Sequence, residues 1–304
     1  MAVICLTAMP RFESFRGLRY AAGPDLSALA CPPYDVIDAT ERARLSDLEP
    51  RNAVHVELPA GHDPYRGAAD TLTDWTTEGV LVRDAAPTLY AYRMTPPASS
   101  PTFGFVGALG VTDADGLLPH EQTTPKARSD RLDLLRATRI NTSPIWALSL
   151  ARGLAAMWSP SGEPVAVATD PDGVLHEMWE VPSEAAGNIA TAVASAPVVV
   201  ADGHHRWETA RNYLREHPGD VGAERVLALV VELSPEELEV RAIHRLVTSL
   251  PRGVRLSDAL ESWFEVVAPE DGEVTLLVGK DEMGLRALPA TREAAAHDAD
   301  AERV

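Results

Sequence analysis

The run 202–206 gathers, within one short stretch, side chains that bind anions and transfer protons: Asp202, Gly203, His204, His205 and Arg206. It follows an apolar segment typical of a buried strand and precedes an amphipathic segment typical of a helix. The first amides of a helix favour an anion, Arg206 can bind phosphate oxygens in a bidentate manner, and Gly203 allows backbone conformations that a side chain disfavours. In a simpler interpretation Asp202 is the N-cap of the helix and the two histidines are incidental. Several polar residues at the end of a buried strand nevertheless destabilise a fold unless they have a function. We therefore predict a phosphate site here.

The segment 120–131 is a second polar cluster, and it lies in a predicted loop ahead of a helix. It mixes one potential base with several cations. In the simpler interpretation a threonine or Ser129 caps the helix and the other side chains form a solvated face, and this alternative stays open. The pair His120-Glu121 is not a zinc-protease signature, because no second histidine follows at the required spacing.

Two further polar groups are ambiguous. Pro32 and Pro33 fix the backbone ahead of Tyr34 and Asp35, whose side chains could line a pocket or serve the structure alone. The pair at 244–245, a histidine and an arginine among apolar neighbours, is better explained as a satisfied pair on a buried strand than as an anion site.

The apolar patterns around these residues predict a mixture of strands and helices, and therefore an α/β (or α+β) fold. Strands are expected at residues 53–58, 89–94, 103–111, 145–150, 165–168, 174–181, 197–201, 226–233 and 240–247. Helices are expected at residues 68–78, 129–139 and 183–194, and directly after Gly203. The inner faces are expected at Ala68, Leu72 and Trp75 in the first helix and at Leu132, Leu135 and Arg136 in the second.

The bulk composition is that of a folded protein with an acidic surface. Apolar residues make up 45% of the 304 residues, and 45 acidic against 27 basic side chains give a formal net charge of −18. Such a charge disfavours nucleic acid and anionic membranes as partners. Cys5 and Cys31 cannot form a disulfide framework, and no segment approaches the roughly 20 consecutive apolar residues of a membrane span. Because the first residues also lack the basic region of a signal peptide, we expect a cytoplasmic protein.

The polar motifs, taken in their order along the chain, resemble a bacterial and archaeal family without an assigned function, the DUF family one-thousand-and-fifteen. The matching motifs are 31–37 (Cys-Pro-Pro-Tyr-Asp-Val-Ile), Asn52 with Val54-His55, His120-Glu121 with Thr123, Lys126 and 130–132 (Asp-Arg-Leu), Asn141 with 143–145 (Ser-Pro-Ile), 201–206 (Ala-Asp-Gly-His-His-Arg) and 208–210 (Glu-Thr-Ala). The resemblance extends over roughly residues 11–247.

A more distant similarity lies inside this pattern. The His-Glu pair, the next helix, the Ser-Pro-Ile strand and the run 202–206 look like the ParB/sulfiredoxin-like fold, in particular the archaeal ADP-dependent free serine kinases. This resemblance implies Glu121 as the base for the substrate hydroxyl, with Asp202 and His205 also catalytic and magnesium at Asp202. The implied phosphate or nucleotide contacts are Gly203, His204, Arg206, Lys126, Arg131 and Thr123, and the implied substrate contacts are Asn141, Ser143, Tyr34 and Asp35.

The resemblance also implies a division of the chain. A ParB/sulfiredoxin-like core is expected at residues 105–250, with an insertion near 151–181. It follows an N-terminal mixed sheet-and-helix region at 1–104 and precedes a C-terminal segment at 251–304 that ends in a loose tail.

The function expected from the resemblance is magnesium-dependent transfer of a phosphoryl group from ATP or ADP to a small hydroxyl compound such as serine. One alternative is a nucleotide-binding regulatory protein without turnover. Another is a metal-dependent hydrolase built on His120, Glu121, His204 and His205. The expected partners are the small-molecule substrate and the nucleotide, without nucleic acid or membrane, and a homodimer stays open.

Overall fold

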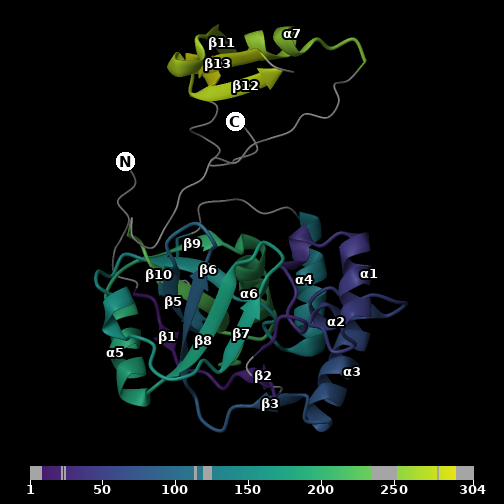
Figure 1. Ribbon diagram of the computed structural model, residues 1–304, viewed down its shortest axis with the longest axis vertical. Coiled ribbons are helices and arrows are strands. Elements are labelled where there is room, and N and C mark those ends of the chain that lie inside the picture. The colour runs from purple at the N-terminus through teal and green to yellow at the C-terminus, as the bar shows by residue number, and fades with distance from the viewer. Residues whose placement is uncertain are drawn as a thin grey trace. The chain divides into compact units, whose positions relative to one another are not determined.

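The computed structural model describes residues 9–21, 23, 25–112, 115–118, 125–234, 252–278 and 281–291, and of residues 125–129, 257, 278 and 281 only the backbone. The described residues up to 234 belong to one compact unit, and those from 252 onward belong to a second. Helices combined with mixed sheets confirm the α/β fold class expected from the sequence (Figure 1). None of the described helices is both long enough and apolar enough to cross a membrane.

An eight-stranded sheet forms the centre of the first unit, with the order β7-β8-β4-β5-β10-β6-β9 and with β1 paired to β5. Its strands are β1 (Phe12–Glu13), β4 (Leu89–Thr95), β5 (Thr102–Gly110), β6 (Ile145–Ser149), β7 (Ala166–Thr169), β8 (Leu175–Val181), β9 (Val198–Asp202) and β10 (Arg225–Glu232). Neighbouring strands are antiparallel except β10 and β6, which run parallel. Seven of these strands match the expected ranges with ends shifted by no more than one residue.

Alternate residues of the central strands pack on opposite faces of this sheet. On one face, Leu89 joins a core cluster that includes side chains of α5 (Ser183–Val193) and α6 (His204–Glu216), among them Trp207. On the other face, Tyr90 joins a second cluster with side chains of β5 and β10. Because β10 contributes to both clusters, its sequence between Arg225 and Glu232 is apolar without interruption rather than alternating.

A group of helices from the N-terminal half packs beside the sheet: α1 (Ala39–Leu48), α2 (Val54–Glu57), α3 (Pro64–Thr77) and, after β5, α4 (Pro125–Thr138) (Figure 1). A short 3-10 helix, η1 (Tyr34–Val36), precedes them. The inner face of α3 is confirmed, since Ala68, Leu72 and Trp75 are buried. That face packs on the strand pair β2 (Leu18–Tyr20) and β3 (Leu81–Arg83).

The strand expected at 53–58 is wrong, since Val54–Glu57 forms one turn of helix. Asn52 starts this turn, because its side-chain oxygen accepts a hydrogen bond from the Val54 amide at 2.9 Å. The Asn52 side-chain amide donates to two backbone carbonyls of the preceding loop at 2.8 and 2.9 Å. Two valines in alternation fit one buried helical turn as well as they fit a strand. The helical turn buries Glu57, which a strand would have placed opposite the valines.

The inner face of α4 also differs from the expected one. The helix buries Arg131 and Leu134, whereas Arg136 is exposed, so the stripe through Leu132, Leu135 and Arg136 is wrong. Arginine is seldom buried unless it is paired, and apolar periodicity therefore does not find it.

The expected boundary between residues 104 and 105 falls inside β5, which pairs with β4 on one side and β10 on the other. The segment 151–181, expected as an insertion, contributes the hairpin β7–β8, and β8 pairs with β4.

The second unit holds α7 (Leu256–Glu261) and a three-stranded antiparallel sheet of order β11-β13-β12. These strands are β11 (Phe264–Val267), β12 (Val274–Val278) and β13 (Asp281–Ala287). The strand expected at 240–247 and the tail beyond residue 291 lie outside the described residues.

Candidate functional site

The run 202–206 lies at a strand-to-helix turn, because β9 ends at Asp202 and α6 begins at His204. Between them Gly203 has a φ of 84°, in the left-handed region, and is the N-cap of α6. A Cβ at this position would lie 3.1 Å from Ile145 Cγ2 and 3.1 Å from Arg206 Nε. The turn therefore requires glycine on both counts. No described side chain caps α6, so the positive end of this 13-residue helix can bind an anion.

Arg206 ties the turn to the start of β6. Its Nη2 donates to Asp202 Oδ2 at 2.9 Å, and its Nη1 donates to Ser143 Oγ at 3.2 Å and to the Pro144 carbonyl. The two segments meet because β6 and β9 are antiparallel neighbours, with Trp146 opposite Asp202. The Arg206 side chain is only 14% exposed, whereas that of Asp202 is 66% exposed. Ser143 and Pro144 thus hold the guanidinium on its buried side, while its ion pair with Asp202 faces solvent.

A buried pair of opposite charge, Glu57 and Arg131, lies on the other side of Ser143. The Ser143 hydroxyl donates to Glu57 Oε1 at 3.1 Å and so connects Glu57 with Arg206. Arg131 Nη1 donates to the Glu57 backbone carbonyl at 2.8 Å and lies 3.8 Å from Glu57 Oε1. Arg131 also donates to Asp130 Oδ2 from Nε at 2.9 Å and from Nη2 at 2.6 Å. The pair is therefore neutralised and held by bonds to the backbone as well as to side chains.

These side chains line one small cavity of about 40 Å³. Its lining residues come from α2, from α4 and the loop after it, and from α6: Glu57, Arg131, Leu134, Leu135, Ile140, Asn141, Thr142, Ser143, Arg206 and Thr209. The structure thus brings together Arg131, Asn141, Ser143 and Arg206, which belong to separate motifs of the sequence.

Tyr34 lies next to this cavity and Asp35 does not line it. The Tyr34 ring covers the guanidinium of Arg131, with 4.1 Å between the guanidinium carbon and the ring centroid. Burial raises the pKa of Tyr34, and Asp35 adds to the effect, while Arg131 and Arg206 oppose it. Tyr34 is therefore a neutral phenol at neutral pH, whereas the Asp35 side chain is exposed to solvent.

The two histidines of the turn lie in protected surroundings. His204 is 5% exposed, and the Nδ1 atom of His205 is buried without a hydrogen-bond partner among the described residues. Asp202 offers an exposed carboxylate beside them. Magnesium commonly takes one or two carboxylates and completes its shell with phosphate oxygens and water, so Asp202 fits a nucleotide-bound magnesium ion. Within the part of the chain that the structure describes, no three His, Cys, Asp or Glu side chains are grouped to hold a metal.

Most of the second polar cluster, residues 120–131, lies outside the described residues. His120, Glu121 and Thr123 are among the residues that are not described, and of Lys126 only the backbone is described. The base and these two phosphate contacts therefore stay predictions.

Among the polar residues that line the cavity, Glu57, Thr142 and Thr209 were not predicted as site residues from the sequence. The signal for Glu57 was Asn52, because an asparagine side chain that accepts from a nearby backbone amide favours a turn over a strand. A helical turn then changes which side chains are buried. For Thr209 the signal was its spacing, since residues three apart on a helix share a face and Arg206 was already a candidate.

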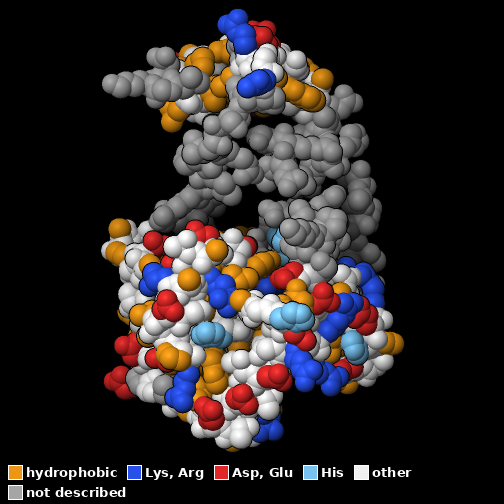
Figure 2. All heavy atoms as spheres, turned by 90° about the vertical axis from the view of Figure 1, so that its right-hand side faces the viewer, with side chains coloured by type: hydrophobic (Ala, Val, Ile, Leu, Met, Phe, Trp, Pro, Cys, Tyr) orange, Lys and Arg blue, Asp and Glu red, His pale blue; other side chains and the backbone are white. Residues whose placement is uncertain are grey.

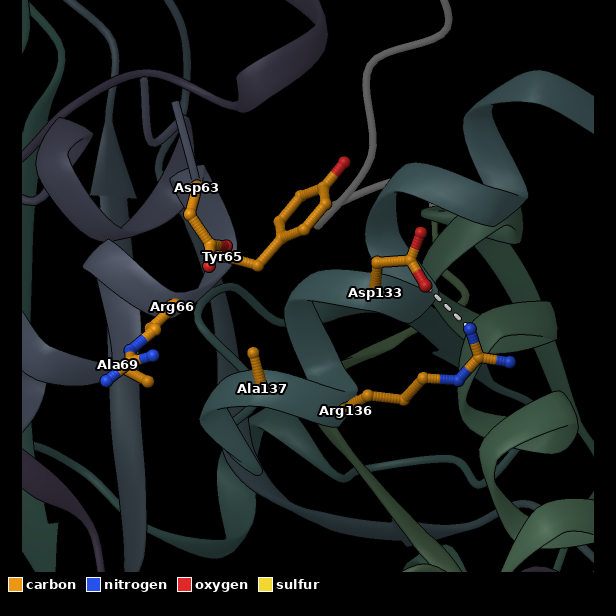
Figure 3. A pocket seen from close by; sticks show the side chains of 7 residues that line it. All are labelled: Asp63, Tyr65, Arg66, Ala69, Asp133, Arg136 and Ala137. Atoms are coloured by element: carbon orange, nitrogen blue, oxygen red, sulfur yellow. Dashed lines mark hydrogen bonds and ion pairs between the residues drawn. The ribbon is translucent and has the colours of Figure 1, made fainter. Parts of the chain in front are cut away.

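A wider groove of about 500 Å³ lies between α3 and α4 (Figure 3). It is lined by Asp63, Tyr65, Arg66, Ala69, Asp133, Arg136 and Ala137. Its α4 residues lie on the helix face opposite to those that line the cavity. Arg136 is already paired, since it donates to Asp133 at 2.6 Å and to Glu216 at 2.9 Å. Basic and acidic side chains are interspersed on this side of the unit (Figure 2). We therefore place the candidate site at the cavity that Ser143 and Arg206 line.

The comparisons with known proteins identify a family. The family model described as "Protein of unknown function (DUF1015)" matches residues 12–301, and the chain belongs to this family. No curated protein and no solved structure matches the chain. The predicted family is therefore confirmed, whereas the ParB/sulfiredoxin-like core stays a prediction.

Proposed function

We propose that this member of the DUF1015 family is a phosphotransferase that uses magnesium and a nucleotide, ATP or ADP, to phosphorylate a small hydroxyl compound such as serine. The observation that carries the proposal is the position of Arg206. This residue lies in the first turn of α6, at the positive end of the helix, and in the wall of a cavity that also contains Ser143 and Asn141. Phosphoryl transfer requires a protein mainly to position phosphates and to neutralise their charge, and this arrangement suits both tasks.

In this proposal, the first turn of α6 and Arg206 bind the phosphate oxygens. The bonds from Arg206 to Ser143 and Pro144 orient the guanidinium in advance, while its exposed bond to Asp202 can exchange for a phosphate. Arg131, Lys126 and Thr123 are proposed as further phosphate contacts.

The remaining roles concern the acceptor and the metal. Asn141, Ser143 and Tyr34 contact the acceptor, Glu121 accepts its hydroxyl proton, and His205 assists. When bound at Asp202, magnesium would neutralise charge on the phosphate oxygens.

Arg206→Ala is expected to weaken nucleotide binding by roughly 10- to 100-fold, because it removes charge-assisted hydrogen bonds to phosphate that contribute roughly 1.5–3 kcal/mol. Calorimetric titration with ADP or ATP and magnesium measures the effect. Arg215→Ala is the matched control, since Arg215 is an exposed arginine at the other end of α6. Arg206→Lys keeps the charge but loses the fork, and we expect it to be intermediate. Equal nucleotide affinity in all three variants would argue against a phosphate site at this turn.

Turnover separates the proposal from its alternatives. The phosphotransferase should consume ADP or ATP only when an acceptor is present, and a panel of hydroxy amino acids is the first set to test. A regulatory protein should bind nucleotide and change its oligomeric state without forming product. A metal-dependent hydrolase should lose activity to a chelator and regain it with zinc or manganese. Either of these last results would replace the proposed function.

A further inference from the structure

Two residues that line the cavity, Glu57 and Thr209, each carry a buried polar atom with no hydrogen-bond partner among the described residues: Oε2 of Glu57 and Oγ1 of Thr209. The Glu57 side chain is 7% exposed and Thr209 is 3% exposed. Buried polar groups are nearly always satisfied, and an unsatisfied one destabilises the fold. Two such atoms on residues that line one cavity therefore point to a ligand or an ordered water that completes their bonds.

The chemistry of these atoms restricts what can bind. The Glu57 carboxylate lies beside the Arg131 guanidinium and acts there as an acceptor, so the group that meets Oε2 must be a donor. The other oxygen of Glu57 is already engaged by the Ser143 hydroxyl at 3.1 Å. On the far side of Ser143, Arg206 offers a guanidinium, which favours an anionic oxygen. A ligand that bonds to both Glu57 and Arg206 therefore carries a hydrogen-bond donor close to an anionic group.

The size of the cavity sets a second limit. A cavity needs about 10–15 Å³ to hold one water molecule. With about 40 Å³, this cavity accepts a short polar end of a molecule and not a nucleoside.

We propose that the cavity binds the polar end of a small ligand that has a hydroxyl or ammonium donor next to an anionic group, and that Glu57 and Thr209 recognise the donor. Glu57 is then a specificity-determining residue, because Ser143 bridges it to Arg206 and so places the donor beside the anion site. The identification of this ligand as the phosphoryl acceptor rests on the proposed function, while its binding to the cavity does not.

Binding of small probes to the full chain without nucleotide tests this inference. Glycolate and glycine carry an anion with a hydroxyl or an ammonium donor, whereas acetate and ethanolamine each lack one half of the pattern. We expect glycolate or glycine to bind at least about tenfold more tightly than acetate and ethanolamine, in ligand-observed NMR titrations. The preference between the first two identifies the donor. If no probe binds, or if acetate binds as tightly as the better of the two, the cavity holds water or a simple anion and the inference is wrong.

Two variants assign the binding to named side chains. Thr209→Val is nearly isosteric and removes a hydroxyl without a described partner, so we expect an unchanged or higher Tm together with weaker probe binding. Thr191→Val, at an exposed site of α5, is its control. Glu57→Gln should weaken binding of the preferred probe by roughly 10- to 100-fold, and Glu184→Gln on the surface of α5 should not. Probe affinity that survives both cavity substitutions would overturn the inference.

The two proposals fail separately. Probe binding to a protein that never turns over nucleotide removes the phosphotransferase assignment and leaves this inference intact. Turnover that continues in Glu57→Gln with an unchanged KM for the acceptor removes this inference and leaves the phosphotransferase assignment.

Discussion

Glu121→Gln is expected to lower turnover by roughly 10²–10⁴-fold while nucleotide affinity stays unchanged. Glutamine has nearly the same shape as glutamate and keeps a hydrogen-bonding group, but it cannot accept the proton of the substrate hydroxyl. The loss should therefore appear in kcat and not in nucleotide binding. Steady-state kinetics and calorimetric titration on the same preparation measure both quantities.

Glu57 provides the decisive comparison for this prediction. Because Glu57 is a buried carboxylate in the cavity wall, it is the alternative candidate for the base among the described residues. We expect Glu57→Gln to raise the KM for the acceptor, since its proposed role is recognition, and Glu121→Gln to lower kcat. Glu184→Gln, an exposed site on α5, serves as the control. The reverse pattern would transfer the role of the base from Glu121 to Glu57, and a loss of nucleotide binding in Glu121→Gln would indicate a metal ligand.

The strands and the strand-to-helix turn could be predicted from the sequence because the residue patterns that indicate them are local. An apolar run such as 226–233, bounded by turn residues, fits a strand covered on both faces, and β10 is such a strand. The run 202–206 likewise combines a strand end, a glycine and a helix start within a few residues, and Gly203 has the positive φ that only glycine adopts readily.

The composition of the cavity was not predictable in this way, because its residues approach one another through tertiary structure. Ser143 reaches Arg206 only because β6 and β9 are neighbours in the sheet. Glu57 becomes buried only because the segment after Asn52 forms a helical turn, although two alternating valines also fit a strand. Arg131 faces inward although periodicity favours apolar residues there, and its burial depends on partners from other elements.

Arg131→Met is expected to destabilise the protein by about 3–5 kcal/mol, because it leaves the Glu57 carboxylate buried without its opposite charge. Methionine keeps much of the length and apolar surface of the arginine stem, so lost packing is a minor part of the effect. Arg131 also loses its bond to the Glu57 backbone carbonyl and its contact with the Tyr34 ring. Chemical denaturation followed by circular dichroism measures the change in the free energy of unfolding.

Arg136→Met on the same helix is the matched control. The Arg136 side chain is 45% exposed and pairs with Asp133 and Glu216 at the surface, where ion pairs contribute about 0–1 kcal/mol each. Combining Arg131→Met with Glu57→Gln then isolates the charge, because the double variant no longer buries an unpaired carboxylate. We expect Glu57→Gln to recover part of the stability lost in Arg131→Met, with an interaction free energy of about 0.5–3 kcal/mol. Strict additivity of the two substitutions would mean that Arg131 stabilises the fold through its backbone and ring contacts alone, and not through the charge of Glu57.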